Sequence, residues 1–214
     1  MIVARLAALG IGYLLGAFQT GYFYGKLHGI DIREHGSGNS GTTNTLRTLG
    51  WKAGLITFSG DVIKVFLAIG LTWLLFHGSY EGAIRLLAAY AGFGTVLGHN
   101  FPFYMHFKGG KGIACTAAVL AVICPYSIPL CAIGFWLVVG ITRYVSAGSI
   151  LMLILFAVQA IVFNHFGVTT LESTYALEYD IVVTCFAIMG IWRHRANIKR
   201  LMNGTENKFG QKAK

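Results

Sequence analysis

Repeated apolar runs of membrane-spanning length constrain the fold of this chain more than any other feature. A helix rises about 1.5 Å per residue, so roughly 20 apolar residues cross the hydrocarbon core of a bilayer. The long runs cover residues 2–24, 53–76, 83–104, 147–166 and 179–192, and the last is short at its N-terminal end. Only 12% of the 214 residues are charged, against about 25% in soluble domains. The sequence therefore predicts an all-α, polytopic integral membrane protein that forms a single domain over residues 1–214.

The remaining apolar stretch, residues 113–142, allows more than one arrangement. Two prolines near its middle favour either one kinked helix or two short helices. Lysines precede the stretch and an arginine follows it, and cationic loops of membrane proteins collect on one side. An even number of crossings satisfies this rule. We therefore expect two short transmembrane helices, around 113–125 and 128–142, with a re-entrant hairpin as the alternative.

Seven spans divide the basic residues very unevenly between the two sides of the membrane. Fourteen Lys and Arg residues fall on one side, only Arg5 and Arg85 fall on the other, and Lys64 lies inside the second span. Since positive loops stay in the cytoplasm, the N-terminus is expected outside and the C-terminus in the cytoplasm. This asymmetry explains most of the net charge of +9. The basic residues are dispersed over short loops, which disfavours nucleic-acid binding.

Two polar, glycine-rich segments interrupt the apolar sequence at residues 36–47 and 98–112. Glycines let backbone N–H groups converge on an anion, and Lys or Arg supplies the countercharge. Further polar segments, 143–149 and 193–206, fall on the same predicted membrane face. Every loop must be polar, but loop polarity alone does not explain glycines beside Asn, Ser and Lys. We expect one shared site for a phosphate-bearing ligand at this face.

Individual residues in these segments suit phosphate chemistry. Lys111 precedes a glycine and a run of small residues typical of a helix N-terminus, where phosphate binds. The GGKG element lacks the GxxxxGK[ST] pattern, which disfavours nucleotide hydrolysis. Ser37 lies between two glycines and would need a nearby base to act as a nucleophile. Arg47 can bind a phosphate through two hydrogen bonds. Uncharged donors in the same segment are Asn39, Thr43 and Asn44.

The other titratable residues give weaker signals. The seven histidines show no metal-ligand pattern, and the four cysteines lie in apolar stretches without a CxxC pair. No metal site is expected. Asp61 and Lys64 lie three residues apart inside the second span, on one helical face. Ionisable residues at membrane depth are functional candidates, but an internal ion pair explains these two without a ligand.

Three motifs resemble the bacterial acylphosphate-dependent glycerol-3-phosphate acyltransferase family, PlsY. The pattern Ser-Gly-Asn-x-Gly-x-Thr-Asn-x-x-Arg extends from Ser37 to Arg47. The pattern Gly-His-x-x-Pro-x-Phe, matched except for Tyr104 at its last position, is followed by Phe-x-Gly-Gly-Lys-Gly, and together they extend over residues 98–112. Arg-His-x-x-Asn-Ile and Gly-Thr-Glu lie within residues 193–206. The resemblance covers essentially the whole chain. It departs from the family at Val65, where Gly is frequent, and at Cys115, where Thr is commoner.

The resemblance implies a seven-helix enzyme of the bacterial cytoplasmic (inner) membrane with its active site on the cytoplasmic face. Such an enzyme moves a fatty acyl group from acyl phosphate to the sn-1 hydroxyl of glycerol 3-phosphate. The products are lysophosphatidic acid and phosphate, in the first acylation step of phospholipid synthesis. Acyl phosphate is already activated, so no cofactor is expected. The expected partners are acyl phosphate, glycerol 3-phosphate, membrane lipid and the peripheral enzyme that makes acyl phosphate.

The resemblance also assigns residues to roles. The expected catalytic residues are Ser37, Arg47, Lys111 and His194. The expected substrate-binding residues are Gly38, Asn39, Thr43, Asn44, His99, Gly109, Gly110, Arg143, Ser149, Arg193, Asn197 and Glu206. His194 and Asn197 position glycerol 3-phosphate or assist proton transfer, unless the acyl phosphate itself accepts the proton. The alternative function is an organic-phosphate transporter, which would place its site near the bilayer midplane. A purely structural membrane protein is a third, weaker alternative.

Overall fold

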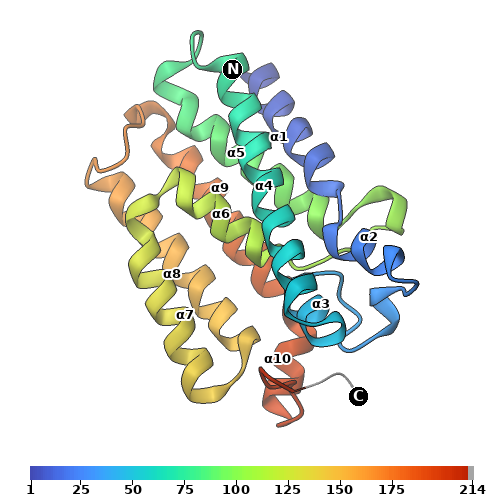
Figure 1. Ribbon diagram of the computed structural model, residues 1–214. Helices are drawn as coiled ribbons and strands as arrows, with labels where there is room; N and C mark the ends of the chain where they lie inside the picture. The colour runs from blue at the N-terminus through green and yellow to red at the C-terminus, as the bar shows by residue number, and fades with distance from the viewer. Residues whose placement is uncertain (212–214) are drawn as a thin grey trace.

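The computed structural model describes residues 1–211, and all their regular elements are helical (Figure 1). The longer helices are α1 (Ile2–Ala17), α4 (Trp51–Phe76), α5 (Ile84–Asn100), α7 (Ile128–Thr142), α8 (Val145–His165) and α9 (Ala176–Arg193). The shorter helices are α2 (Thr20–Leu27), α3 (Thr42–Leu49), α6 (Ile113–Ile123) and α10 (Arg195–Met202). The expected all-α fold is confirmed for the described residues.

Five segments of the described chain are long and apolar enough to cross a membrane. They are Ile2–Leu27, Trp51–Phe76, Pro125–Thr142, Val145–His165 and Ser173–Arg193. Helix α5 has 17 residues and α6 has 11, fewer than the roughly 20 residues that a perpendicular crossing needs. The described residues therefore supply five segments of full length rather than the seven that the charge pattern predicts.

The ambiguous stretch 113–142 forms two separate helices, as expected. Helix α6 ends at Ile123, two residues earlier than predicted, and α7 covers the predicted residues 128–142. Cys124 leaves the helical conformation immediately before Pro125, because a proline disfavours the helical conformation of the residue before it. Residues 124–127 therefore separate two distinct helices.

The first expected span, 2–24, is broken rather than continuous. Helix α1 ends before Phe18, whose backbone is extended at φ −63° and ψ 119°. The carbonyl oxygen of Phe18 accepts a hydrogen bond from Lys64 Nζ at 2.9 Å. The side chain of Gln19 is buried at the break, where it forms hydrogen bonds with the His99 carbonyl and the Ser40 hydroxyl. The bond from Lys64 thus satisfies the Phe18 carbonyl, a backbone group without a helical partner at the break.

Other boundaries also differ from the expectation. Helix α9 begins at Ala176, three residues before the predicted start at 179. Two polar segments expected to be loops contain the short helices α3 and α10. Their hydrophobic residues are few, so the periodicity of apolar residues gives little warning of either helix.

Close packing of α1 against α5 depends on glycines of both helices. A Cβ atom on Gly16 would lie 2.2 Å from the Thr95 carbonyl oxygen. A Cβ atom on Gly94 would lie 2.2 Å from the Leu9 carbonyl oxygen. Small residues at both surfaces let the two backbones approach closely, as is common for helices in lipid. Gly98, four residues after Gly94, packs in the same way, because a Cβ atom on it would lie 2.1 Å from the Tyr13 carbonyl oxygen.

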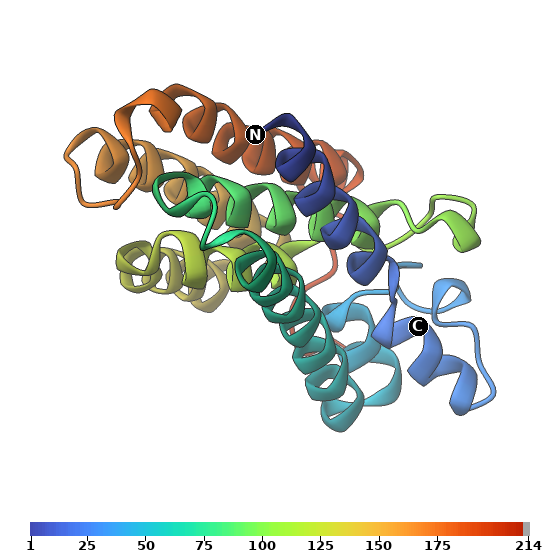
Figure 2. The ribbon, with the colours of Figure 1, turned by 90° about the horizontal axis from the view of Figure 1, so that it is seen from above.

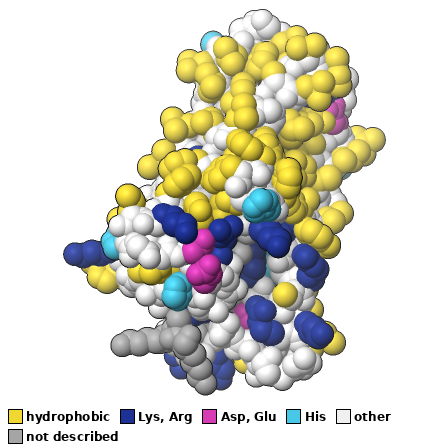
Figure 3. Space-filling model, turned by 90° about the vertical axis from the view of Figure 1, so that its right-hand side faces the viewer, with side chains coloured by type: hydrophobic (Ala, Val, Ile, Leu, Met, Phe, Trp, Pro, Cys, Tyr) yellow, Lys and Arg dark blue, Asp and Glu magenta, His cyan; other side chains and the backbone are white. Residues whose placement is uncertain are grey.

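Polar and apolar surfaces separate along the long axis of the molecule. Helices α7 and α8 lie on one side of the bundle and α2 and α3 on the other (Figure 2). Hydrophobic side chains dominate the upper part of the face in Figure 3, and Lys, Arg and acidic side chains gather in the lower part. The N-terminus lies at the end opposite to α10 (Figure 1). The polar end therefore collects the segments in which the sequence predicts a site.

Candidate functional site: two cavities with a common wall

Two adjoining cavities occur at the polar end. The larger has a volume of about 590 Å³ and the smaller one of about 450 Å³. Four residues line both cavities: Ser37, Asn39, Lys111 and Asn197. These residues come from the loop before α3, the loop before α6, and α10. The expected convergence of distant polar segments is therefore present, and it forms the common wall of two spaces.

The larger cavity has a polar entrance, here called the mouth, and an apolar inner part enclosed by helices, here called the barrel. The mouth consists of Ser37, Asn39, Thr42, Thr43, Arg47, Lys111, His194, Asn197 and Glu206. The barrel consists of Ala114, Ala117, Leu120, Ala121, Ile128, Cys131, Ala132, Phe135, Trp136 and Met152, from α6, α7 and α8. The barrel residues of α6 and of α7 recur every three or four positions, so each helix presents one face. A molecule with an anionic head and a long apolar tail fits this division.

The smaller cavity is polar and mostly cationic. Its basic residues outside the common wall are Arg33, Lys108, Arg193 and Arg200, and its acidic residues are Asp31 and Glu34. Asp31 is already paired with Arg33 Nη2 at 2.7 Å and with Lys26 Nζ at 3.3 Å. The remaining positive charge suits a small anion such as a phosphate monoester.

Glycine conformation and one asparagine shape the loop before α3. Gly36 and Gly38 have positive φ of 60° and 69°, a region that favours glycine. The Asn44 Oδ1 atom accepts a hydrogen bond from the Ser37 backbone N–H at 2.7 Å. Its Nδ2 donates to two carbonyls of the preceding turn. The side-chain amide of Asn44, an expected substrate contact, thus forms hydrogen bonds within the protein that hold Ser37 at the cavity wall.

The glycine-rich loop before α6 is fixed by hydrogen bonds from both sides. The Gly109 and Gly110 N–H groups donate to the carbonyls of Asn100 and His99 at 3.1 and 3.0 Å. Arg193 donates to the carbonyls of Gly109 and Gly110 at 2.9 and 2.7 Å. A Cβ atom on Gly110 would lie 1.9 Å from His99 Nε2. Four expected substrate-binding residues therefore support the shape of the loop that carries Lys111.

A polar network connects Lys111 to the C-terminal segment. Lys111 Nζ donates to Asn197 Oδ1 at 2.5 Å, and Asn197 Nδ2 donates to Glu206 Oε1 at 2.7 Å. Glu206 Oε1 also accepts from Ser146 Oγ at 3.1 Å, and its Oε2 pairs with Arg200 Nε at 2.8 Å. The carboxylate of Glu206 is thereby committed to protein partners. It orients Asn197 and lowers the local excess of positive charge.

Burial changes the proton affinity of the basic groups in the mouth. The pKa of the Lys111 ammonium falls from 10.5 to about 8, chiefly because of burial; Glu206 opposes this shift, and the nearby Arg200, Arg193 and Arg47 add to it. Burial likewise lowers the pKa of Arg47, although Arg47 stays charged. A positive charge held at a partly desolvated site gains from the arrival of an anion. The mouth is therefore poised to bind a negatively charged group.

His194 lies buried at the mouth in its neutral form. Burial, with a smaller contribution from the charge of Lys111, lowers the pKa of its imidazole from 6.5 to about 4. His194 Nδ1 lies 2.7 Å from the Gly190 carbonyl oxygen. A carbonyl only accepts hydrogen bonds, so Nδ1 carries the proton and Nε2 has a free lone pair. The ring can accept a hydrogen bond from a substrate hydroxyl, but it is a weak base.

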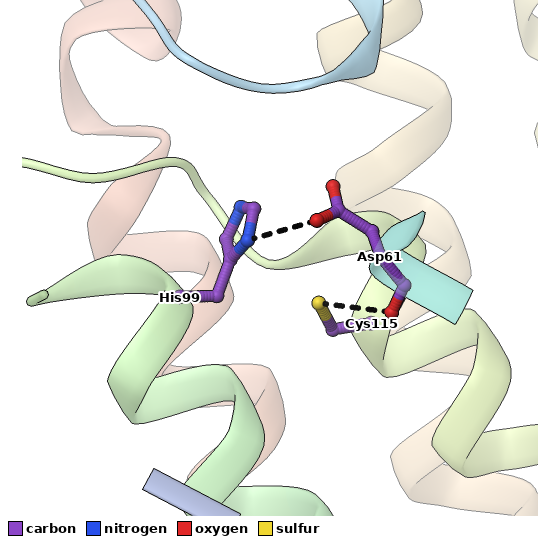
Figure 4. Close-up of side chains that lie close together, drawn as sticks. All are labelled: Asp61, His99 and Cys115. Atoms are coloured by element: carbon purple, nitrogen blue, oxygen red, sulfur yellow. Dashed lines mark hydrogen bonds and ion pairs between the residues drawn. The ribbon is translucent and has the colours of Figure 1, made fainter. Parts of the chain in front are cut away.

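Asp61 and Lys64 form a buried ion pair, as the three-residue spacing suggests. Lys64 Nζ lies 2.8 Å from Asp61 Oδ1 and 2.8 Å from His99 Nδ1. Figure 4 shows Asp61, His99 and Cys115 converging from three helices, and their ligand atoms lie within 4.8 Å of one another, close enough to hold a metal ion. The ammonium of Lys64 already contacts two of these groups. An internal cation thus fills the role that a metal ion would have there.

Two expected substrate-binding residues differ in their placement. Ser149 lines the larger cavity, although its hydroxyl donates to the Val145 carbonyl at 2.8 Å. Arg143 is exposed and is absent from the lining of both cavities. Its Nη2 donates to the Phe209 carbonyl at 2.8 Å, and its own carbonyl accepts from the Phe209 N–H at 2.6 Å. Arg143 therefore fastens the C-terminal segment rather than facing the cavities, because the turn between α7 and α8 lies beside that segment.

The cavities also contain residues that the sequence interpretation did not select. Thr42 is the first residue of α3, and its Oγ1 is buried at the mouth without a hydrogen-bond partner among the described residues. Its position after Gly41 at a helix start was a usable signal. Arg33, Lys108 and Arg200 line the smaller cavity, and their charge alone did not distinguish them from other loop residues. The small residues at 114, 117 and 121 follow one face of α6, a spacing visible in the sequence.

Known proteins resemble this chain over nearly its whole length. The model of the family described as glycerol-3-phosphate acyltransferase matches residues 6–204. Relatives of that name are 40% identical in Shouchella clausii (99% of each chain), 42% in Clostridioides difficile (94% of each) and 41% in Bacillus subtilis (97% of this chain, 98% of the relative).

Solved structures show the same fold. The crystal structure of PlsY (YgiH), an integral membrane glycerol 3-phosphate acyltransferase, in its glycerol 3-phosphate form superposes with a TM-score of 0.79. It is 32% identical in sequence over 96% of each chain. Its lysophosphatidic acid form gives a TM-score of 0.76 at 30% identity over 96% of this chain and 95% of that one. The resemblance seen in the motifs is thereby confirmed, and this chain belongs to the glycerol-3-phosphate acyltransferase family of integral membrane proteins.

Proposed function

We propose that this membrane acyltransferase moves a fatty acyl group from acyl phosphate to the sn-1 hydroxyl of glycerol 3-phosphate. The products are 1-acyl-glycerol 3-phosphate and phosphate. The observation that carries this proposal is the common wall of Ser37, Asn39, Lys111 and Asn197 between an amphipathic cavity and a polar one. Two substrates bound on the two sides of that wall meet at Lys111.

The larger cavity takes the acyl donor in this proposal. The fatty chain lies in the apolar barrel and the phosphate lies at the mouth, between Arg47 and Lys111. Thr42 contributes its unpaired hydroxyl, and the first N–H groups of α3 are free to bind an anion because they have no partner within the helix. Acyl phosphate needs no CoA-binding surface. In this cavity a site for the phosphate continues directly into a site for the fatty chain.

The smaller cavity takes glycerol 3-phosphate. Its phosphate is a dianion near neutral pH, which matches the cluster of Arg33, Lys108, Arg193 and Arg200. The glycerol end then reaches the common wall, where the hydroxyl of Ser37 and the amide of Asn197 orient it. His194 accepts a hydrogen bond from the attacking hydroxyl through Nε2.

The reaction is a direct acyl transfer. The sn-1 oxygen forms a bond to the acyl carbonyl carbon, and the bond between that carbon and the phosphate oxygen breaks. Lys111 and Arg47 stabilise the negative charge that develops on the departing phosphate. With a pKa of about 4, His194 is a poor proton acceptor, whereas a phosphate with a second pKa of about 6 is a better one. The proton of the hydroxyl therefore leaves with the phosphate.

The charge distribution supports an orientation for the protein. We place the polar end in the cytoplasm and the N-terminus outside, because 14 of the 17 Lys and Arg residues follow this arrangement. Helices α5 and α6 complete the seven spans in this arrangement, shielded from lipid by neighbours at their short ends. Bacterial relatives support a location in the cytoplasmic membrane. Both substrates then arrive from the cytoplasmic side, and the peripheral enzyme that makes acyl phosphate is a natural partner.

Phosphate release by the purified protein tests the proposal. The protein in detergent is mixed with palmitoyl phosphate and glycerol 3-phosphate, separately and together. Release that requires both substrates supports the acyltransferase. Glycerol 3-phosphate counterflow in proteoliposomes without acyl consumption would support a transporter instead. The control variant is Arg5→Met, which removes a charge at the opposite end of α1 and should retain wild-type release.

A further inference from the structure

The buried cluster of Asp61, Lys64 and His99 is connected to both glycine-rich loops, and none of its ionisable groups has a role in the proposed reaction. The side chains of these residues are at most 5% exposed. Asp61 and His99 border the inner end of the larger cavity's lining, whereas Lys64 does not line it. Lys64 Nζ meets three acceptors: Asp61 Oδ1 at 2.8 Å, His99 Nδ1 at 2.8 Å and the Phe18 carbonyl at 2.9 Å. An ammonium group has three donor hydrogens, so every donor of Lys64 is used inside the protein.

One connection leads from this cluster to the loop that carries Lys111. The His99 carbonyl accepts the Gly110 N–H at 3.0 Å, and the His99 ring packs so closely that no side chain fits on Gly110. The Asp61 carbonyl accepts a weak hydrogen bond from Cys115 Sγ at 3.6 Å (Figure 4). Cys115 lies in the first turn of α6, three residues after Gly112. The loop is therefore held at its middle and just after its end.

A second connection leads to the loop that carries Ser37. Lys64 fixes the break between α1 and α2 at Phe18, and Gln19 follows directly. Gln19 Nε2 donates to the His99 carbonyl at 2.9 Å, and Gln19 Oε1 accepts from Ser40 Oγ at 2.9 Å. The amide of Gln19 therefore bridges the loop before α3 and the residue that holds the loop before α6.

We infer that Lys64, neutralised by Asp61, is a positioning residue that sets the spacing of the two loops and hence of Ser37 and Lys111 across the common wall. The effect of Lys64 on kcat rests on the proposed function, whereas its effect on the spacing of the loops does not. Chemical steps respond strongly to small displacements of the groups that align the reactants. An ion cluster that only joins helices would affect stability but not the two loops selectively.

The test uses a variant that removes both charges of the pair, Lys64→Met combined with Asp61→Leu. Replacing a buried ion pair by apolar residues of similar volume often leaves stability nearly unchanged. We expect kcat to fall at least tenfold, while KM for palmitoyl phosphate stays within threefold because the barrel is intact. The matched control is Arg5→Met with Glu178→Leu, an ion pair about 20 Å away along α1, which should keep kcat within twofold.

Hydrogen–deuterium exchange provides a readout that needs no substrate. In the Lys64→Met/Asp61→Leu variant, peptides covering residues 36–47 and 105–116 should both exchange faster than in the wild type, and α8 should be unchanged. If the variant does not fold, Gln19→Leu replaces it, because this change cuts the bridge without leaving a buried charge. Gln19→Leu should accelerate exchange in residues 36–47 and lower kcat at least threefold.

The outcomes separate this inference from the proposed function. Unchanged exchange in either loop, or a kcat within twofold of the wild type, overturns the positioning role. Faster exchange in both loops together with the loss in kcat supports it. If wild-type protein does not turn over palmitoyl phosphate, the proposed function fails, and exchange alone then decides the positioning role.

Discussion

The mouth and the barrel of the larger cavity are built in different ways. The mouth draws residues from three separate polar segments, and long-range hydrogen bonds such as Lys111 Nζ to Asn197 Oδ1 hold them together. The barrel comes from three consecutive helices, α6, α7 and α8, and consists of apolar side chains at helical spacing. The reaction proposed at the mouth depends on the relative placement of a few groups. The barrel only needs space of the right length.

Removing one cation from the mouth should have the largest effect. We expect Lys111→Ala and Arg47→Ala each to lower kcat/KM by about 10²–10³, as for loss of one charge-stabilising donor in other enzymes. Phosphate release from palmitoyl phosphate measures this change. Lys52→Ala is the matched control, since Lys52 is an exposed cation at the same end and its loss should change the rate less than twofold. Wild-type turnover by either mouth variant contradicts the role of the mouth.

The alkaline limb of the pH profile should report Lys111. With a pKa of about 8, Lys111 is mostly protonated at pH 7 and loses its charge as the pH rises through 8. We expect kcat/KM, which reflects the free enzyme, to fall on the order of tenfold between pH 8 and pH 9.5. The Lys111→Arg variant keeps its charge and should lack this limb. A wild-type profile that stays flat to pH 9.5 would show that the charge of Lys111 is not required.

Filling the barrel should change chain-length preference without affecting the chemistry. Ala117 and Ala121 line the barrel one turn apart on α6, a separation of about 6 Å. Ala121→Leu should lower kcat/KM for palmitoyl phosphate about fivefold and spare shorter chains, because an obstruction costs little once the chain ends before it. Ala117→Leu, nearer the mouth, should impair shorter chains as well. Acyl phosphates of 8, 12 and 16 carbons measure both variants.

The control variant for the barrel adds side-chain volume on the exposed face of α7, away from the cavity. Ile133 on α7 is 62% exposed and does not line the cavity, so Ile133→Phe should leave the chain-length profile unchanged. Equal loss for all three chain lengths in the Ala121→Leu variant would mean that the chain lies elsewhere.

The smallest effect should come from Arg143, which the sequence places among the substrate contacts and the structure places outside both cavities. Arg143→Ala removes one bond to the Phe209 carbonyl and should reduce kcat/KM less than threefold. The kcat/KM of the Arg47→Ala variant, measured in the same assay, shows how large the loss is for a residue at the mouth. A fall in kcat/KM of a hundredfold or more would show that Arg143 contacts a substrate after all.

The sequence predicts the parts of this site better than their arrangement. The glycines around Ser37 and Lys111 indicate phosphate-binding loops because the backbone conformations they permit are local properties. The break at Phe18 depends on Lys64 from another helix, so no local pattern predicts it. Asn44 resembles a ligand donor in the sequence, yet its amide braces the loop. Tertiary partners decide which polar residues face a cavity and which support the ones that do.

The identity and stoichiometry of the products test the central claim most directly. Purified protein is incubated with palmitoyl phosphate and glycerol 3-phosphate, and mass spectrometry quantifies 1-palmitoyl-glycerol 3-phosphate beside the released phosphate. Direct transfer across the common wall predicts equal molar amounts of the two products, and no acylated product when palmitoyl-CoA replaces palmitoyl phosphate. Phosphate release without the acylated product, or acylation that proceeds from palmitoyl-CoA, would contradict the account.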